Sequence, residues 1–138
     1  MKRTPAIICD IDGTIAHRGN RSPYDWSRVG QDIPDETMLS ILPMFIANGY
    51  RIILVSGRDS VCRQDTKDWL DKYSVPYHRL YMRAKDDNRK DYIVKREIYE
   101  KLIKPKYEVL LVLDDRNQTV EMWRDVGLKC LQVAEGDF

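Results

Sequence analysis

Short, almost continuous apolar runs alternate with helix-like segments along this sequence, and this alternation limits the fold more than any other feature. The runs Pro5 to Cys9, Arg51 to Val55 and Val109 to Leu113 contain almost no polar side chains. Strands with this pattern are buried on both faces, as in parallel sheets covered by helices. Weaker runs at Arg79 to Met82 and Lys129 to Val133 predict two further strands.

Helix-like segments separate the predicted strands. They span Asp35 to Asn48, Ser60 to Tyr73, Lys90 to Ile103 and Gln118 to Val126. This alternation predicts an α/β fold, a Rossmann-like three-layer α/β/α sandwich with a mainly parallel, five-stranded sheet. At 138 residues, the chain suits one domain spanning 1–138. The polar stretch at about 16–33, which contains two glycines and Pro23, predicts a small cap insertion, either a loop or a hairpin.

Charge and cysteine content narrow the possible environments. The formal net charge is +1, so attraction to a polyanion would need local clustering of basic residues. Cys9, Cys62 and Cys130 lack C-x-x-C spacing, which predicts reduced core residues and a cytoplasmic location. Asp10 and Asp12 interrupt the first apolar stretch, which argues against a signal peptide, and no apolar run is long enough to span a bilayer. We therefore expect no membrane partner.

Polar, reactive residues follow three of the predicted strands. The first strand leads into D-I-D-G-T at Asp10 to Thr14, the second into S-G-R at Ser56 to Arg58, and a later one into Asp114-Asp115. The carboxyl ends of parallel strands meet at one edge of a sheet, where ligands bind. Clustered carboxylates repel one another unless a cation lies between them. The sequence therefore predicts a cation-dependent site at this edge.

These motifs resemble those of the haloacid dehalogenase superfamily, most of whose members are phosphatases. D-I-D-G-T is similar to the first motif of that superfamily, and Ser56, Lys95 and Asp114-Asp115 match the second, third and fourth in order. The resemblance implies a phosphomonoester hydrolase that uses Mg²⁺ and forms an aspartyl-phosphate intermediate.

A narrower resemblance covers nearly the whole chain. The runs S-G-R-D-S, R-K-D-x-x-x-K, L-D-D-R-N-Q-T-V-E-M-W-R and Q-V-A-E-G-D-F are similar to the 3′-phosphatase domain of bacteriophage polynucleotide kinase/phosphatases. This resemblance implies removal of a 3′-terminal phosphate from DNA or RNA ends during nucleic-acid repair. The segment Asp59 to Lys67 is shorter than in those enzymes. No G-x-x-x-x-G-K-[ST] loop occurs in these 138 residues, so we expect a free-standing phosphatase or one half of a larger system, with a separate kinase or ligase as a candidate partner.

The residue chemistry suggests a role for each catalytic candidate. Asp10 would attack the phosphorus, and Asp12 would protonate the leaving oxygen and later activate water. Ser56 would donate a hydrogen bond to a phosphoryl oxygen, and Lys95 would neutralise developing charge. Metal ligands would come from Asp10, the backbone carbonyl of Asp12, and one or both of Asp114 and Asp115. The resemblance favours Asp115 as the direct ligand.

A second group of residues is predicted to bind substrate or to orient the catalytic groups. Thr14 offers a hydroxyl to the nucleophile's loop. Arg21 and Arg58 are candidates for binding the phosphate or the adjacent nucleotide. Asp91 lies one helical turn before Lys95 and is expected to orient it. Tyr24 or Trp26 could stack on a base, although such aromatics are more often core or groove-wall residues.

Substrate identity is open on sequence grounds. Basic residues outnumber acidic ones between Arg79 and Arg96, which suits a phosphodiester backbone but equally suits a solvated helix start. The leading hypothesis is a polynucleotide 3′-phosphatase, and the main alternative is a small-molecule phosphatase acting on nucleotides or sugar phosphates. A receiver-like phosphoacceptor module is an alternative of another class. Receivers lack the D-x-D pair, so Asp12 favours an enzyme that turns over. DNA or RNA preference, action on a 2′,3′-cyclic phosphate and oligomeric state stay open.

Overall fold

A computed structural model describes residues 2–138. Its main sheet contains β1 (Thr4–Cys9), β4 (Arg51–Asp59), β5 (Arg79–Arg83), β6 (Tyr107–Asp114) and β7 (Cys130–Gln132). The helices are α1 (Glu36–Ala47), α2 (Arg63–Lys72), α3 (Asp91–Ile98) and α4 (Asn117–Asp125), with the short helices η1 (Trp26–Gln31), η2 (Ser60–Cys62) and η3 (Tyr99–Ile103). A separate two-stranded sheet joins β2 (Ala16–His17) to β3 (Ile33–Pro34). The predicted strands and helices are all present.

The five strands of the main sheet are parallel and lie in the order β5-β4-β1-β6-β7. The chain adds β4 and β5 on one side of β1, then crosses back to add β6 and β7 on the other. The strand order therefore reverses beside β1, and the carboxyl ends of β1, β4 and β6 meet at this switch point. The parallel α/β class predicted from the sequence is confirmed.

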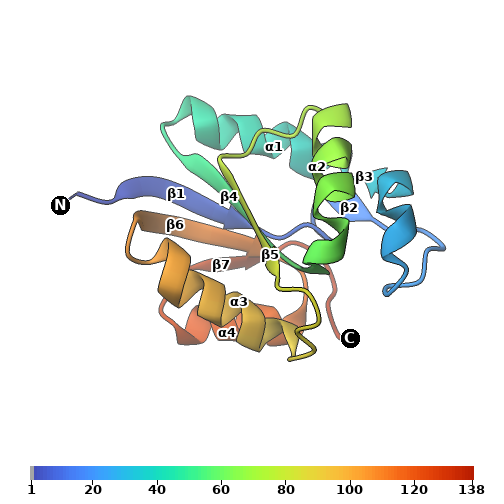
Figure 1. Ribbon diagram of the computed structural model, residues 1–138. Helices are drawn as coiled ribbons and strands as arrows, with labels where there is room; N and C mark the ends of the chain where they lie inside the picture. Colours follow the sequence, from blue (N-terminus) through green and yellow to red (C-terminus); the bar gives the residue numbers. More distant parts are fainter. Residues whose placement is uncertain (1) are drawn as a thin grey trace.

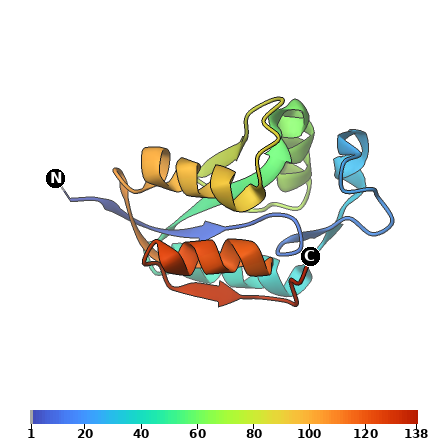
Figure 2. The same ribbon diagram turned by 90° about the horizontal axis from the view of Figure 1, so that it is seen from below.

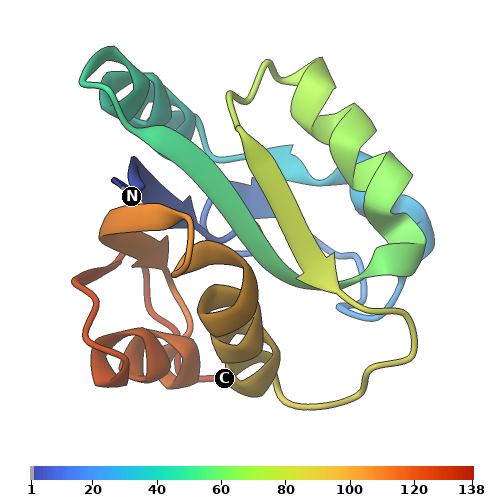
Figure 3. The same ribbon diagram turned by 60° about the vertical axis from the view of Figure 1, so that its left-hand side comes forward.

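Helices cover both faces of the sheet (Figures 1 and 3). On β1, Ala6 and Ile8 pack with residues of α3, η3 and α4, whereas Ile7 and Cys9 pack with residues of α1 and α2. Adjacent strand residues point to opposite faces, so a strand buried on both sides must be apolar throughout. This arrangement explains the continuous apolar runs.

Two elements differ from the sequence-based expectation. The second strand was predicted to end at Val55 but continues to Asp59, because β5 pairs with β4 as far as Asp59 and Arg83 after a register shift. Ser56 and Gly57 are therefore held on the strand itself. The helix predicted to reach Ile103 does so, but its last turn, η3, is a wider π-helical turn.

The residues between β1 and α1 form an insertion around the antiparallel pair β2–β3, with η1 between the two strands. Figures 1 and 2 show that it projects from the end of the molecule toward which the β1 arrow points. The C-terminus lies at this same end, and the N-terminus lies at the opposite end. Both the insertion and the C-terminal tail are thus placed beside the switch point.

All three cysteines are buried and free, as predicted. Burial raises the pKa of the Cys9 thiol well above its ordinary value and that of Cys130 to about 12, so neither forms a thiolate readily. Across residues 2–138, no helix is both long and apolar enough to cross a membrane.

Candidate active site

Three carboxylates converge at the switch point. Asp10 follows β1, Asp114 ends β6 and Asp115 comes next, and all three are buried. One oxygen from each lies within 4.8 Å of the others. Burial, together with the charge of Asp114, raises the pKa of Asp10 well above its ordinary value, although Lys95 acts in the opposite direction. The cluster is therefore an electrostatically costly arrangement that a bound cation would relieve.

Lys95 is the only cation that hydrogen-bonds to this cluster among the described residues. Its Nζ donates to Asp10 Oδ1 at 2.8 Å and to Asp114 Oδ2 at 3.1 Å. Burial alone would lower the pKa of Lys95, but the charges of Asp10 and Asp114 outweigh burial and raise it above its ordinary value. Lys95 is thus a fixed positive charge, and it leaves two of the three negative charges unbalanced.

Backbone geometry brings the first loop against Asp115. Gly13 has φ of +80°, and a Cβ at this position would lie 2.0 Å from Asp115 Oδ2. No other residue fits without displacing that carboxylate. Thr14 is buried and its hydroxyl donates to Asp10 Oδ2 at 3.3 Å. The D-x-D-G-T motif therefore supplies the carboxylates of Asp10 and Asp12 and, through Gly13, the close approach of this loop to Asp115.

Asp12 is set apart from the buried cluster by its exposure and its partners. Its side chain is 44% exposed. The Arg58 guanidinium holds both of its carboxylate oxygens, with Nη2 at 2.8 Å and Nε at 3.0 Å. Arg21 Nη2 lies 3.6 Å from the same carboxylate. Asp12 is thus oriented from behind while one side stays open to solvent, as an acid that serves an incoming substrate requires.

The two arginines have different partners from those expected. Arg21 and Arg58 were candidates for direct phosphate binding, but both are buried and paired with carboxylates of the chain. Asp32 joins them, accepting from Arg21 at 2.8 and 2.9 Å and from Arg58 at 2.6 Å. Thr66 also accepts from Arg58. Their geometry fits orientation of Asp12 better than direct capture of phosphate.

Ser56 lies on β4, and Asp91 is the first residue of α3. The buried Ser56 hydroxyl accepts from the Arg58 backbone N–H at 3.1 Å and keeps its own proton to donate. Asp91 does not hydrogen-bond to Lys95, contrary to the expected orienting role. Its carboxylate instead binds Arg83 and, at 2.9 Å, Arg116 Nη1. A Cβ on Gly57 would lie 2.6 Å from Asp91, so this carboxylate packs directly on the Ser56 strand.

Sequence patterns did not reveal several groups that contact the site. Asp32 lies in the insertion, and its spacing from the sequence motifs gives no sign of a role in the site. Trp123 Nε1 donates to Asp114 Oδ2 at 3.1 Å, and its neighbours in the E-M-W-R run were the available signal. Arg83 and Arg116 bind Asp91. The last residue of β7 also contacts the loop between β6 and α4, since Gln132 Nε2 donates to the Asp115 carbonyl at 2.9 Å.

The donor set fits a hard divalent cation. Carboxylate oxygens are the ligands that Mg²⁺ prefers, and Asp10, Asp114 and Asp115 present them from a rigid backbone. Their mutual repulsion, which Lys95 only partly offsets, is the physical sign that a further cation belongs here. The residues therefore fit Mg²⁺.

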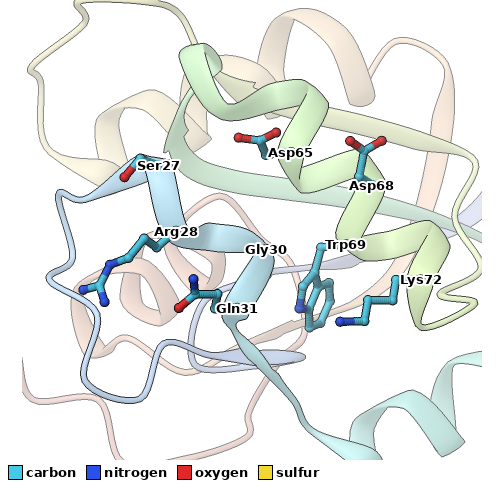
Figure 4. A pocket seen from close by; sticks show the side chains of 8 residues that line it. All are labelled: Ser27, Arg28, Gly30, Gln31, Asp65, Asp68, Trp69 and Lys72. Carbon is cyan, nitrogen blue, oxygen red and sulfur yellow. The ribbon is translucent and has the colours of Figure 1, made fainter.

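A separate pocket of about 360 Å³ lies between η1 and α2 (Figure 4). Asp65, Asp68 and Lys72 line it from α2, and Gln31 lines it from η1. It contains none of the catalytic candidates. The two carboxylates on its wall make it a poor site for a phosphate group.

Comparisons with known proteins identify the family of this chain. The sequence profile described as the polynucleotide kinase PNKP phosphatase domain matches residues 4–138. A protein of Autographa californica nuclear polyhedrosis virus, whose name describes it as a bifunctional polynucleotide kinase/RNA ligase, is 41% identical over 129 residues. The match covers 89% of this chain but only 18% of the viral protein.

Solved structures show the same relationship. A chain of the Pnkp1/Rnl/Hen1 complex matches with a TM-score of 0.96 at 42% identity, covering 100% of this chain and 48% of that one. A class C acid phosphatase from Bacillus anthracis shares the fold, with a TM-score of 0.67 at 18% identity over 98% of this chain and 68% of its own. The chain spans about half, or less, of the length of the Pnkp1 chain and the viral protein that it matches. It belongs to the family of polynucleotide kinase PNKP phosphatase domains and is a phosphatase of the haloacid dehalogenase type.

Proposed function

We propose that this chain is a Mg²⁺-dependent polynucleotide 3′-phosphatase that works through an aspartyl-phosphate. The observation that supports this most directly is the contrast between Asp10 and Asp12. Asp10 is buried among carboxylates and a lysine, whereas Asp12 is half-exposed and held in place by Arg58. A nucleophile and a separately oriented acid on one loop suit a two-step phosphoryl transfer.

In the first step, an Asp10 carboxylate oxygen attacks the phosphorus, and the bond from phosphorus to the 3′-oxygen breaks. Asp12 gives its proton to that leaving oxygen. In the second step, Asp12 takes a proton from water, whose oxygen attacks the phosphorus and releases Asp10 and inorganic phosphate. Lys95 and Ser56 bind phosphoryl oxygens, and Thr14 holds the nucleophile.

Asp10, Asp115 and the backbone carbonyl of Asp12 would hold Mg²⁺, with Asp114 acting through water. When bound, the ion neutralises the repulsion between the carboxylate and the phosphate dianion. Asp114 also fixes the loop, because one of its oxygens accepts from the Asp115 backbone N–H at 2.8 Å while the other binds Lys95 and Trp123.

A polynucleotide end is the favoured substrate because of the family and the small insertion, which leaves Asp12 open. The names of the viral relative and of the Pnkp1/Rnl/Hen1 RNA repair complex suggest RNA ends and a kinase or ligase partner, and we propose both for this chain. A small-molecule phosphatase is the alternative. Membership of a phosphatase family argues against a receiver-like module.

Phosphate release from a defined set of substrates tests the proposal. The set comprises RNA and DNA oligonucleotides bearing a 3′-phosphate, the same oligonucleotides bearing a 5′-phosphate, and a nucleoside 3′-monophosphate, each with Mg²⁺. We expect rapid release from the 3′-phosphorylated oligonucleotides only. Equal release from all substrates would instead favour the small-molecule alternative.

The Asp10→Asn variant tests the nucleophile. The amide has nearly the same shape but cannot form an acyl phosphate, so we expect at least about a 1,000-fold loss of turnover. The substitution removes one of three mutually repelling charges, so the fold should survive, which circular dichroism would check. Substantial turnover by a folded Asp10→Asn variant would exclude Asp10 as the nucleophile.

A further inference from the structure

The most exposed aromatic side chain of the insertion is Tyr24, and the structure gives a reason for its position. Tyr24 is 83% exposed. It occupies the third position of a tight turn from Ser22 to Asp25, closed by a hydrogen bond of 3.0 Å from the Asp25 N–H to the Ser22 carbonyl. Pro23 precedes it and favours this turn geometry. The ring is thus presented to solvent from a stiff support.

Arg21 connects this turn to the catalytic acid. Its Nη1 donates to the Ser22 carbonyl at 3.2 Å and to the Asp25 carbonyl at 3.4 Å, so it holds both ends of the turn. Its Nη2 lies 3.6 Å from Asp12. A single buried guanidinium therefore separates the turn that bears Tyr24 from the carboxylate of Asp12.

The other aromatic residue of the insertion is already engaged. The Arg21 guanidinium lies over the ring of Trp26, 6.0 Å from its centroid, and Trp26 is partly buried. Trp26 therefore supports Arg21, and Tyr24 is the ring left free for a ligand.

We propose that Tyr24 stacks on the base of the terminal nucleotide, the one whose 3′-oxygen leaves. This inference rests on the proposed function. The leaving oxygen must come within hydrogen-bonding reach of Asp12 to receive its proton, so the terminal nucleoside lies beside Asp12. Aromatic rings bind bases of any sequence by stacking. Tyr24 would then give the enzyme its preference for a nucleotide end over a bare phosphomonoester.

The test is a cycle of two changes, one in the protein and one in the substrate. Wild type, Tyr24→Ala and Tyr24→Phe are assayed on a 3′-phosphorylated oligonucleotide with a normal terminal base and on one with a reduced abasic terminal sugar. We expect Tyr24→Ala to lose about tenfold in kcat/KM on the normal end, mainly through KM, and nothing further on the abasic end. Tyr24→Phe should retain most of the activity because it keeps the ring.

A matched control comes from the same insertion. Ile33 is 58% exposed, and Ile33→Ala should leave both substrates unaffected. An equal loss by Tyr24→Ala on both ends, or no loss on either, would overturn the stacking role while leaving the proposed function intact. A wild-type enzyme inactive on every 3′-phosphorylated end would overturn the proposed function and the stacking role together.

Discussion

At the scale of single residues, Asp32 is the group on which two buried cations depend. Its side chain is almost fully buried and accepts hydrogen bonds from Arg21 and Arg58, the two arginines that face Asp12. Neither arginine has another fully buried carboxylate among its described ion pairs. The orientation of Asp12, the proposed acid, therefore depends on a residue that is itself buried.

We predict that Asp32→Asn lowers both stability and turnover. Removing one charge from a buried pair typically costs about 3 kcal/mol, which urea unfolding would measure. A displaced Asp12 should lower kcat by about 10- to 100-fold with a smaller change in KM. A variant that loses stability but keeps the full kcat would show that the network only supports the fold.

The sequence predicted the position of residues at strand ends, but it missed contacts made by the irregular insertion. Asp10, Asp12 and Asp114 follow apolar strands, so their meeting at one edge follows from the parallel sheet. The pairing of Arg58 with Asp32 spans 26 positions and depends on how an irregular insertion folds back. Spacing carries no signal for such a contact, which is why Arg21 and Arg58 looked free to bind phosphate.

At the scale of elements, the N-cap residue of α1, Asp35, binds both the first turn of its helix and a residue of the insertion. Asp35 accepts from the Met38 backbone N–H at 3.0 Å, as an N-cap does, and it binds His17 of β2 at 2.9 Å. It therefore joins the first helix to the insertion. The hydrogen bond from His17, followed by that from Met38, lowers the pKa of Asp35.

The pH dependence of this cap has a definite sign. Folding lowers the pKa of Asp35. The ionised carboxylate therefore contributes to stability above its unfolded pKa of about 4, and this contribution is lost as pH falls through the folded pKa. We predict that Asp35→Ala costs about 1 kcal/mol at pH 7, and that the difference from wild type shrinks near pH 3. Urea unfolding at both pH values would measure it, with Asp35→Asn as the variant that keeps a cap. A difference independent of pH would contradict the charged-cap account.

The C-terminal tail contacts the loop between β6 and α4, which carries Asp115. A Cβ on Gly136 would lie 1.7 Å from the Asp115 carbonyl oxygen, so the two backbones are in direct contact. The Gly136 carbonyl accepts from the Asn117 N–H at 2.9 Å, and Arg116 Nε donates to the Phe138 carbonyl at 2.9 Å. The tail thus fixes the loop between β6 and α4 from outside.

We predict that Gly136→Ala disturbs the site from a distance. The contact is with backbone, which cannot rotate away as a side chain can, so the tail or the loop between β6 and α4 must move. We expect a lower melting temperature and a several-fold higher Mg²⁺ concentration at half-maximal activity. Gly30→Ala is a matched control, because a Cβ there meets nothing within 4 Å. Equal behaviour of the two variants would show that the tail does not hold the loop.

At the scale of the whole molecule, the burial of the parallel strands accounts both for the fold and for the cluster of carboxylates at the strand ends. Strands buried on both faces leave only their ends for polar residues, so the sheet concentrates like charges at the switch point. The predicted α/β architecture followed from this pattern, whereas the length of β4 did not, because pairing with β5 decided where it ends. Burial stabilises the sheet and at the same time raises the pKa of Asp10 and Asp115.

This coupling predicts how Mg²⁺ affects stability without reference to activity. An ion that binds only the folded state stabilises it by about 2.7 kcal/mol at 100 times its dissociation constant. We therefore expect Mg²⁺ to raise the melting temperature of the wild-type protein by several degrees, and chelator to reverse the rise. Asp115→Asn should melt at or above the metal-free wild type, because one repelling charge is gone, yet should gain little from Mg²⁺. Asp68→Asn, on α2 and away from the cluster, should respond as wild type does. An equal Mg²⁺ response in the Asp115 and Asp68 variants would place the ion elsewhere.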